Sequence, residues 1–336
     1  MQLHETGEFE LIDQWQHLLR RARHPKVLLG IGDDAACLND LTKPVFSCDA
    51  LVEGIHFRCD WISSRQLGWK AMAVNISDMA AMGAAPVAAT ASLGLPEDTA
   101  SEWVEELYVG FADAAAAFHF EVAGGDTTRA NQIMISVAII GELIGDNALR
   151  RDKARAGDVL LLTGNVGDSA AGLAVLKSGQ ILESANAAVR YCIERHFCPT
   201  PRVREIRAAL GEAGADVHAA IDISDGITGD AAHIAKRSQL DLEIDVAQIA
   251  ISPECREVAQ SLKIDPMQWA LAGGEDYELL IAVAPEKVDN VVAAVCANTG
   301  APVHRIGHCV ATSESPQVRL HREGHIIHAA GSWRHF

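Results

Sequence analysis

Short apolar runs with strand character are mixed irregularly with helical segments along this chain, and this pattern limits the possible folds most strongly. Strict alternation of strand and helix is missing, which argues against a Rossmann fold or a barrel. We therefore expect an α+β protein with mixed sheets. The expected strands are 44–52, 86–95, 132–143, 159–163, 219–224, 240–246, 277–284 and 303–310, and the expected helices are 8–21, 64–82, 99–119, 168–178, 185–196, 202–213 and one after Gly226.

The pattern starts again after a polar stretch, RRDKARAGD, which begins at Arg150. A chain of 336 residues is long for one hydrophobic core, because cores stop growing at roughly 250–300 residues. We therefore expect two domains, 1–150 and 151–336.

Charge and cysteine usage exclude several classes of protein. The chain has 28 Lys and Arg against 45 Asp and Glu, a net charge of −17, which argues against nucleic acid or an anionic membrane surface as a partner. No apolar run is long enough to span a bilayer, and the first ten residues do not resemble a signal peptide, so we expect a cytoplasmic protein. The eight cysteines form no CxxC pair, which favours neither a disulfide framework nor structural zinc.

Aspartates stand at the ends of apolar strands and on one apolar helix. Asp33 and Asp34 are adjacent in GIGDDAA after an apolar approach, and burying two unpaired carboxylates is so unfavourable that a cation is expected beside them. Asn75 and Asp78 are spaced i, i+3 on one helix face. The further members of this acidic set are Asp49, Asp126, Asp222 and Asp225.

Each of these aspartates alone can be explained as a turn residue or a helix cap. Together they indicate a site for a hard cation, because oxygen ligands without His or Cys select Mg²⁺, Mn²⁺ or Ca²⁺. EF-hand spacing is absent from the sequence. Magnesium, held by a few carboxylates and completed by substrate phosphates, fits this set best.

Three further segments have two readings each. TGNVGDSAAGL (163–173) is either a phosphate-binding turn without the Walker A lysine or a tight turn in which Asp168 caps the next helix. AGGEDYEL (272–279) is either a functional loop or the entry to a hairpin. His56, in VEGIHF, is either a ligand-binding residue or a structural hydrogen-bond donor. A GxSxG nucleophile turn is absent, so nucleophilic catalysis finds little support.

The chain resembles the thiamine-monophosphate kinases, a family within the aminoimidazole ribonucleotide synthetase-like superfamily. The resemblance runs from about residue 7 to the C-terminus. The motifs that carry it are GIGDDAA, SCDALVEGIHF, AVNISDMAAMGA, GGDTTR, TGNVGDSAAGL, IDISDG, GGEDYEL and the terminal SWRHF, in this order.

The resemblance implies a two-domain fold of the superfamily, with an N-terminal domain that binds ATP and magnesium and dimerises, and a C-terminal α+β domain that completes the nucleotide and substrate sites. It implies a homodimer, ATP as co-substrate and several Mg²⁺ ions. Cys48 departs from the usual Thr or Ser, and it can ligate metal through its backbone carbonyl. The implied residues are Asp34, Ser47, Cys48, Asp49, Asp78, Asp126, Asp222 and Asp225 for metal, Tyr108, Gly125, Arg151 and Ser224 for ATP, and His56, Glu275 and Trp333 for the second substrate.

The activity implied by the resemblance is transfer of the ATP γ-phosphoryl group to thiamine monophosphate, which gives thiamine diphosphate and ADP. The attacking phosphate oxygen is already ionised, so direct in-line transfer needs no protein base and no covalent intermediate. Asp49, Asp78 and Asp126 then act only through metal. Arg151 adds a fixed cation, while Glu275 and Trp333 suit the cationic thiazolium ring. Trp333 can instead be a core anchor.

Two other functions remain open on sequence alone. The first is an ATP-dependent synthetase of the same superfamily, which would release free phosphate. The second is a non-catalytic Mg-nucleotide sensor, which would bind ATP without turnover.

Overall fold

The structure is a computed structural model that describes residues 17–19, 22–31, 35–179, 186–312 and 314–327. Asp33, Asp34 and Trp333 lie outside these residues, as does most of the helix expected at 8–21. The chain divides into two compact units, the first formed by 1–79 and 84–143 and the second by 80–83 and 144–336. The functional roles that we expect for the two parts of the chain stay predictions.

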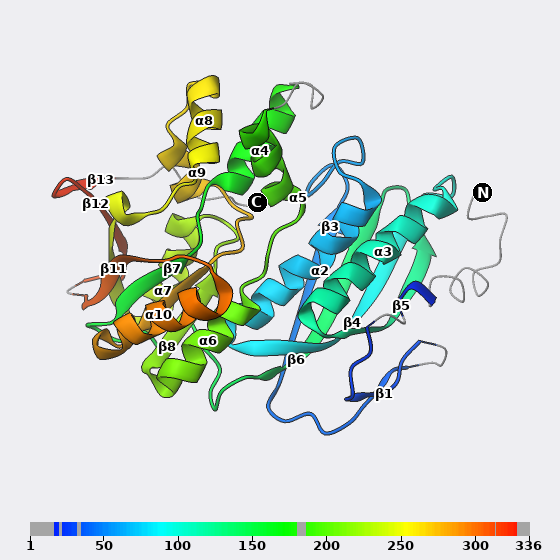
Figure 1. The fold of residues 1–336 in the computed structure, drawn as a ribbon, viewed down its shortest axis with the longest axis horizontal. Coiled ribbons are helices and arrows are strands. Elements are labelled where there is room, and N and C mark those ends of the chain that lie inside the picture. The colour runs from blue at the N-terminus through cyan, green and yellow to red at the C-terminus, as the bar shows by residue number, and fades with distance from the viewer. Residues whose placement is uncertain (1–16, 20–21, 32–34, 180–185, 313, 328–336) are drawn as a thin grey trace. The chain divides into compact units, whose positions relative to one another are not determined.

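The first unit contains a four-stranded mixed sheet with strand order β3-β6-β4-β5. Helices α2 and α3 lie along one face of this sheet (Figure 1). A short two-stranded sheet, β1 and β2, belongs to the same unit. The elements are β1 (Val27–Leu29), β2 (Cys37–Leu38), β3 (Pro44–Val52), α2 (Ser64–Ala81), β4 (Ala84–Leu95), α3 (Ser101–Phe118), β5 (Glu121–Arg129) and β6 (Met134–Leu143).

Side chains alternate along β3, and the two faces of the sheet differ as a result. Leu51 is buried, and alternation along the strand places it on the same face as Ser47, which bonds to α2. Phe46, on the opposite face, is 70% exposed, and Met134 on β6 is 39% exposed. We call this opposite side the open face. Part of it packs against residues from the β1–β2 segment, around Ala88 and Ala123.

Helices α2 and α3 cross with their backbones in close approach, because each has a glycine at the crossing. A Cβ atom on Gly68 would collide with the carbonyl oxygen of Leu107, and one on Gly110 would collide with that of Arg65. Neither glycine has a positive φ, so the requirement is for space and not for an unusual backbone conformation.

We expect Gly110→Ala to lower the free energy of unfolding by about 1–3 kcal/mol, because the two helices must move apart to admit the methyl group. Gly211→Ala is the matched control, since Gly211 lies inside helix α6 (Val203–Ala213) with nothing within 4 Å of the added Cβ. That control should gain roughly 0.5–1 kcal/mol from helix propensity. Urea unfolding measures both; a Gly110→Ala protein as stable as the control would contradict this account of the crossing.

The second unit is built on a seven-stranded mixed sheet with strand order β13-β12-β9-β11-β7-β10-β8. Its strands are β7 (Val159–Thr163), β8 (Val217–Asp222), β9 (Leu240–Asp245), β10 (Leu279–Val283), β11 (Val303–Ala311), β12 (Val318–Arg322) and β13 (His325–Ile327). Helices α6, α7 (Ile227–Ser238) and α10 (Val288–Thr299) contact these strands, whereas α4 (Asp168–Ser178), α5 (Ala187–Phe197), α8 (Pro253–Leu262) and α9 (Pro266–Ala272) contact one another.

The α+β class with mixed sheets is confirmed, and the expected bounds of β3, β7 and α4 agree with the structure. The strand expected at 219–224 is wrong at its end, because β8 stops at Asp222. The carboxylate of Asp230 accepts the backbone N–H groups of both Ser224 and Asp225 at 3.0 Å, which turns the chain out of the sheet. Strand β5 was not expected, since its two glycines conceal the pattern.

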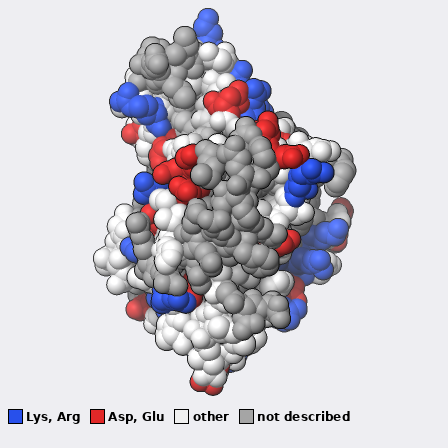
Figure 2. All heavy atoms as spheres, turned by 90° about the vertical axis from the view of Figure 1, so that its right-hand side faces the viewer, with Lys and Arg blue, Asp and Glu red and all other residues white. Residues whose placement is uncertain are grey.

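Within the described residues, no helix is both long enough and apolar enough to cross a membrane. On the face drawn in Figure 2, the Lys and Arg side chains stand in separate groups with Asp and Glu between them. The described residues of that face therefore form no continuous basic surface, which agrees with the acidic composition.

Candidate functional site

Three polar residues of the first unit meet where β3 faces α2, and we call Ser47, Asp49 and Asp78 the β3–α2 cluster. The hydroxyl of Ser47 donates a hydrogen bond to the carboxylate of Asp78. The backbone N–H of Asp49 donates to Oδ1 of Asn75 at 3.0 Å, and Nδ2 of Asn75 donates to the carbonyl of Ala71 at 3.0 Å. The i, i+3 pair on α2 is thus tied to the strand, as the helix periodicity predicts.

The two carboxylates of this cluster repel one another. The pKa of Asp49 is raised to about 6, first because its carboxyl is partly desolvated and second because Asp78 is negatively charged. The residue as a whole is nevertheless exposed, so a ligand can reach Asp49. A bound cation would relieve both effects, so the donor set of hard oxygens with excess negative charge fits Mg²⁺.

A cation at the β3–α2 cluster would still need further ligands. Among the described residues, no group of three or more His, Cys, Asp and Glu is arranged to hold a metal. Magnesium characteristically takes one or two protein carboxylates and completes its shell with water and substrate phosphates. The cluster therefore suits a metal that arrives with a phosphorylated ligand.

Cys48 and Asp126 lie on the open face, opposite to the β3–α2 cluster. Ladder partners share a face, and Asp126 pairs with Ser92, which pairs with Ser136 in the next strand. Sγ of Cys48 lies 3.6 Å from Oγ of Ser136 on that same face. The structure thus groups Ser47 with Asp49 and Asp78, and places Asp126 on the other side of the sheet. It also leaves the backbone carbonyl as the group through which Cys48 can act.

Tyr108 and Gly125 lie at the contact between α3 and the edge strand β5. The hydroxyl of Tyr108 makes a hydrogen bond with the side chain of Thr127, and burial raises the pKa of this tyrosine. A Cβ on Gly125 would collide with the carbonyl oxygen of Ala91, so only glycine allows β5 to approach β4 this closely. Two of the four residues predicted to contact ATP, Tyr108 and Gly125, therefore belong to one small region of the first unit.

His56 follows β3 in a tight turn. Its Nδ1 atom accepts the backbone N–H of Val52 at 3.1 Å, and the backbone N–H of His56 donates to the carbonyl of Val52 at 2.9 Å. An accepting Nδ1 places the ring proton on Nε2, so His56 can donate a hydrogen bond from Nε2. The structural reading and the ligand-binding reading of His56 are therefore compatible.

In the second unit, Asp222, Ser224 and Asp225 surround the start of α7. Asp230, in the first turn of that helix, accepts the N–H groups of Ser224 and Asp225. Burial raises the pKa of Asp230 to about 8, and the charges of Asp222 and Asp225 act in the same direction. Sequence reasoning missed Asp230; its place four residues after Gly226 was the available signal.

Arg151 lies in the turn that is fixed to the far end of α7. Oγ of Ser238, the last residue of α7, donates to the carbonyl of Arg151 at 2.7 Å and accepts the N–H of Ala154 at 3.1 Å. One helix therefore organises two of the predicted segments, because its first turn holds Ser224 and its last residue holds the backbone of Arg151.

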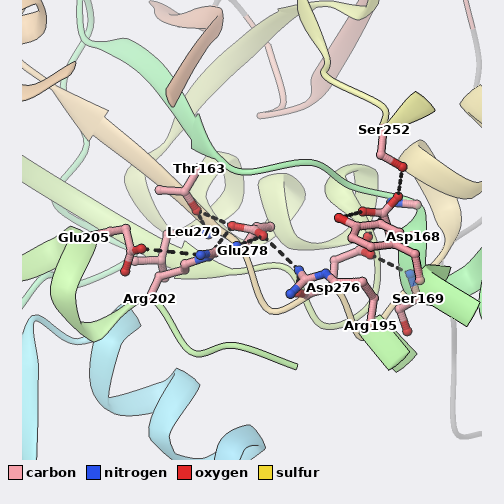
Figure 3. Close-up of polar contacts among 12 residues, drawn as sticks. Thr163, Asp168, Ser169, Arg195, Arg202, Glu205, Ser252, Asp276, Glu278 and Leu279 are labelled. Atoms are coloured by element: carbon pink, nitrogen blue, oxygen red, sulfur yellow. Dashed lines mark hydrogen bonds and ion pairs between the residues drawn. The ribbon is translucent and has the colours of Figure 1, made fainter. Parts of the chain in front are cut away.

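The loop 273–278, from the GGEDYEL motif, ends in a buried charged network (Figure 3). Glu278 is fully buried, and its carboxylate accepts from Nε of Arg202 at 2.6 Å, Nη2 of Arg195 at 3.0 Å and Oγ1 of Thr163 at 2.7 Å. These residues were not predicted, although a glutamate at the entrance of an apolar strand was visible in the motif.

Asp276, in the same loop, caps helix α4. Its carboxylate accepts the backbone N–H of Gly167 at 2.7 Å and of Ser169 at 3.1 Å, and burial raises its pKa to about 8. Of the two readings of this turn, the one in which Asp168 caps α4 is wrong, because the carboxylate of Asp168 accepts instead from Ser252 at 2.5 Å and Tyr191 at 3.1 Å. The N-terminus of α4 is thus occupied by the protein's own carboxylate, which weighs against the phosphate-binding reading of that turn.

Comparison with known proteins agrees with the two-unit architecture. Residues 32–143 match the family described as "AIR synthase related protein, N-terminal domain", and residues 155–318 match the corresponding C-terminal domain. A thiamine-monophosphate kinase of Escherichia coli (strain K12) is 39% identical over 315 residues, which cover 92% of each chain.

Two solved structures extend this likeness to the fold. A crystal structure of the thiamine-monophosphate kinase from Stenotrophomonas maltophilia K279a is 34% identical, with a TM-score of 0.81 and coverage of 95% of this chain and 97% of that one. A structure described as AaThiL complexed with AMPPCP and TMP is 34% identical, with a TM-score of 0.77 and coverage of 100% and 99%. By sequence and by fold, this chain belongs to the thiamine-monophosphate kinase family.

Proposed function

We propose that this protein transfers the γ-phosphoryl group of ATP to thiamine monophosphate, producing thiamine diphosphate and ADP. The observation that carries this proposal is the likeness over the whole chain to AaThiL, whose structure is described as a complex with AMPPCP and TMP. The kinase names of relatives with 92% mutual coverage support the same activity.

The acceptor in this reaction is a phosphate oxygen that is already ionised at neutral pH. Its attack on the γ-phosphorus therefore needs no general base, and a direct in-line displacement needs no covalent enzyme intermediate. What the protein must supply is alignment of two anionic substrates and compensation of their repulsion. The β3–α2 cluster, composed of two carboxylates and a hydroxyl, suits that task through a cation.

We propose that several Mg²⁺ ions accompany ATP. Bound magnesium would neutralise phosphate charge and fix the reacting groups. Among the described residues, the proposed ligands on the first unit are Ser47, the Cys48 carbonyl, Asp49, Asp78 and Asp126, and those on the second unit are Asp222 and Asp225. Asp34, which completes the proposed set, lies outside the described residues. The raised pKa values of Asp49 and Asp230 support the proposal, because a bound cation would stabilise the ionised carboxylates at both places.

The remaining proposed contacts divide by substrate. Tyr108, Gly125, Arg151 and Ser224 contact ATP, with Arg151 as a fixed cation. His56 donates from Nε2 toward thiamine monophosphate, and Glu275 offers a carboxylate to the cationic thiazolium. Trp333, proposed for stacking on that ring, lies outside the described residues.

We propose that the protein acts as a homodimer whose first units pair through their strands. Phe46 and Met134 are exposed on the open face, and burial of these apolar side chains against a partner would favour such a contact.

An assay with two acceptors tests the proposal. With ATP and Mg²⁺, thiamine monophosphate should be converted to thiamine diphosphate with one ADP for each product molecule, whereas free thiamine should react at least about a hundredfold more slowly, because its hydroxyl is neither ionised nor bound as a phosphate. Chromatography of both products measures this. Release of free phosphate would indicate a synthetase, and ATP binding without turnover would indicate a nucleotide sensor; either result would overturn the proposal.

A further inference from the structure

The last turn of α5 contacts the loop 273–278 through two adjacent side chains. Arg195 donates to the carbonyl of Asp276 at 3.4 Å and to the carboxylate of Glu278 at 3.0 Å. His196 lies with its Nδ1 atom 3.3 Å from Oε2 of Glu275. Because Glu278 is fully buried and Arg195 is half-buried in the network of Figure 3, this end of α5 is a rigid base for the loop.

His196 is held tightly in one orientation. Its side chain is only 5% exposed, and its ring lies against that of Phe197 with the centroids 5.7 Å apart. Oγ of Ser169, at the start of α4, lies 3.0 Å from the same Nδ1 atom. Rotation of the ring would break these contacts together, so Nδ1 is directed at Glu275 by packing on two helices.

Ser169, His196 and Glu275 resemble a hydrolase triad in residue type, but their geometry excludes that role. In such a triad the serine and the acid contact different ring nitrogens, so that one accepts a proton while the other is held by the acid. Here both contacts are made by Nδ1, and Ser169 is 1% exposed. A different function for His196 is therefore required.

The backbone of Glu275 is also fixed. It adopts a left-handed conformation with φ of 66°, which is unfavourable for a residue with a side chain. Its N–H donates to the carbonyl of Ser224 at 2.9 Å, and the N–H of Tyr277 donates to the carbonyl of Ile223 at 2.9 Å. The glutamate is thus anchored beside a proposed ATP-binding residue, and its side chain, 25% exposed, still reaches the surface.

We propose that His196 is a positioning residue for Glu275, whose carboxylate it holds toward the cationic ring of thiamine monophosphate. An ionised carboxylate only accepts hydrogen bonds, so His196 holds Oε2 of Glu275 through a proton on Nδ1, which the hydroxyl oxygen of Ser169, 3.0 Å from the same nitrogen, can also accept. This inference rests on the proposed function, because it assumes that Glu275 binds the second substrate.

Two amide substitutions of His196 test the inference with matched chemistry. In His196→Asn the amide nitrogen occupies the position of Nδ1, and in His196→Gln it occupies that of Nε2. We expect His196→Gln to raise KM for thiamine monophosphate about tenfold, the effect of one lost charge-assisted hydrogen bond. His196→Asn should keep KM within about twofold of the wild-type value. In both variants kcat and KM for ATP should stay within about twofold.

Comparison with Glu275→Gln separates the proposed substrate contact of Glu275 from the positioning role of His196. If His196 acts through Glu275, the double variant His196→Gln/Glu275→Gln should have the same KM as Glu275→Gln alone. A normal KM in Glu275→Gln would overturn the proposed role of the glutamate. A raised KM in Glu275→Gln together with equal KM values for His196→Asn and His196→Gln would overturn only the positioning role. Thermal unfolding of each variant identifies losses due to misfolding. Misfolding would lower activity in both the Asn and the Gln variant, whereas the positioning role predicts a raised KM in His196→Gln alone.

Discussion

Replacing Asp78 with asparagine is expected to lower kcat by at least about a hundredfold, which corresponds to roughly 3 kcal/mol of transition-state stabilisation. Asp78 lies on α2 and accepts a hydrogen bond from Ser47, so an isosteric amide keeps the shape of the β3–α2 cluster. It removes one of the two negative charges that suit the cluster to a divalent cation. The protein should fold normally, because relief of the repulsion between Asp49 and Asp78 does not destabilise it.

Asp113→Asn is the control for this experiment. Asp113 lies on α3 of the same unit and forms an exposed ion pair with Arg65 at 2.7 Å, which contributes little to stability or activity. Steady-state rates at saturating thiamine monophosphate and ATP measure kcat of each variant, and thermal unfolding shows whether each variant folds normally. An Asp78→Asn protein that converts thiamine monophosphate at the wild-type rate would disprove the role that we assign to this carboxylate.

Replacing Glu278 with glutamine is expected to destabilise the protein by about 3–5 kcal/mol, because it removes the buried counter-charge of Arg195 and leaves Arg202 with only the more distant carboxylate of Glu205, at 3.4 Å. Glu278 has no exposed surface, and the side chains of Arg195 and Arg202 are only 14% and 13% exposed. Removing one member of such a network leaves the full desolvation cost of the others. Urea unfolding of the whole chain measures the effect.

Glu97→Gln provides the comparison. Glu97 pairs with Arg129 at 3.0 Å, but the two side chains are 62% and 76% exposed, so solvent screens the pair. Its loss should change the free energy of unfolding by less than about 0.5 kcal/mol. Equal effects of the two substitutions would show that burial does not control the strength of these pairs.

The sequence was most informative where hydrophobic periodicity was strong. The strands at 44–52 and 159–163 and the helix at 168–178 were predicted with their observed bounds, because each is a continuous apolar or helical pattern between polar turns. Strand β5 was missed, since Gly124 and Gly125 lower its strand propensity while the parallel ladder with β4 supplies the missing stability.

The candidate site was predictable in residue type but not in arrangement. The i, i+3 spacing placed Asn75 and Asp78 together, as the structure confirms. Strand register decides the face on which Asp126 lies, and register depends on pairing with distant residues that a single sequence does not specify. The cap of α4 comes from Asp276, more than a hundred residues away along the chain, so no local motif could indicate it.

The stereochemical course at phosphorus tests the central claim most directly. The reaction is run with ATP made chiral at the γ-phosphorus by oxygen isotopes and sulfur, and the configuration of the terminal phosphate in thiamine diphosphate is then determined. Our account predicts inversion, the outcome of a single in-line transfer between ATP and thiamine monophosphate. Retention would require a phosphorylated enzyme between two displacements, and would contradict it.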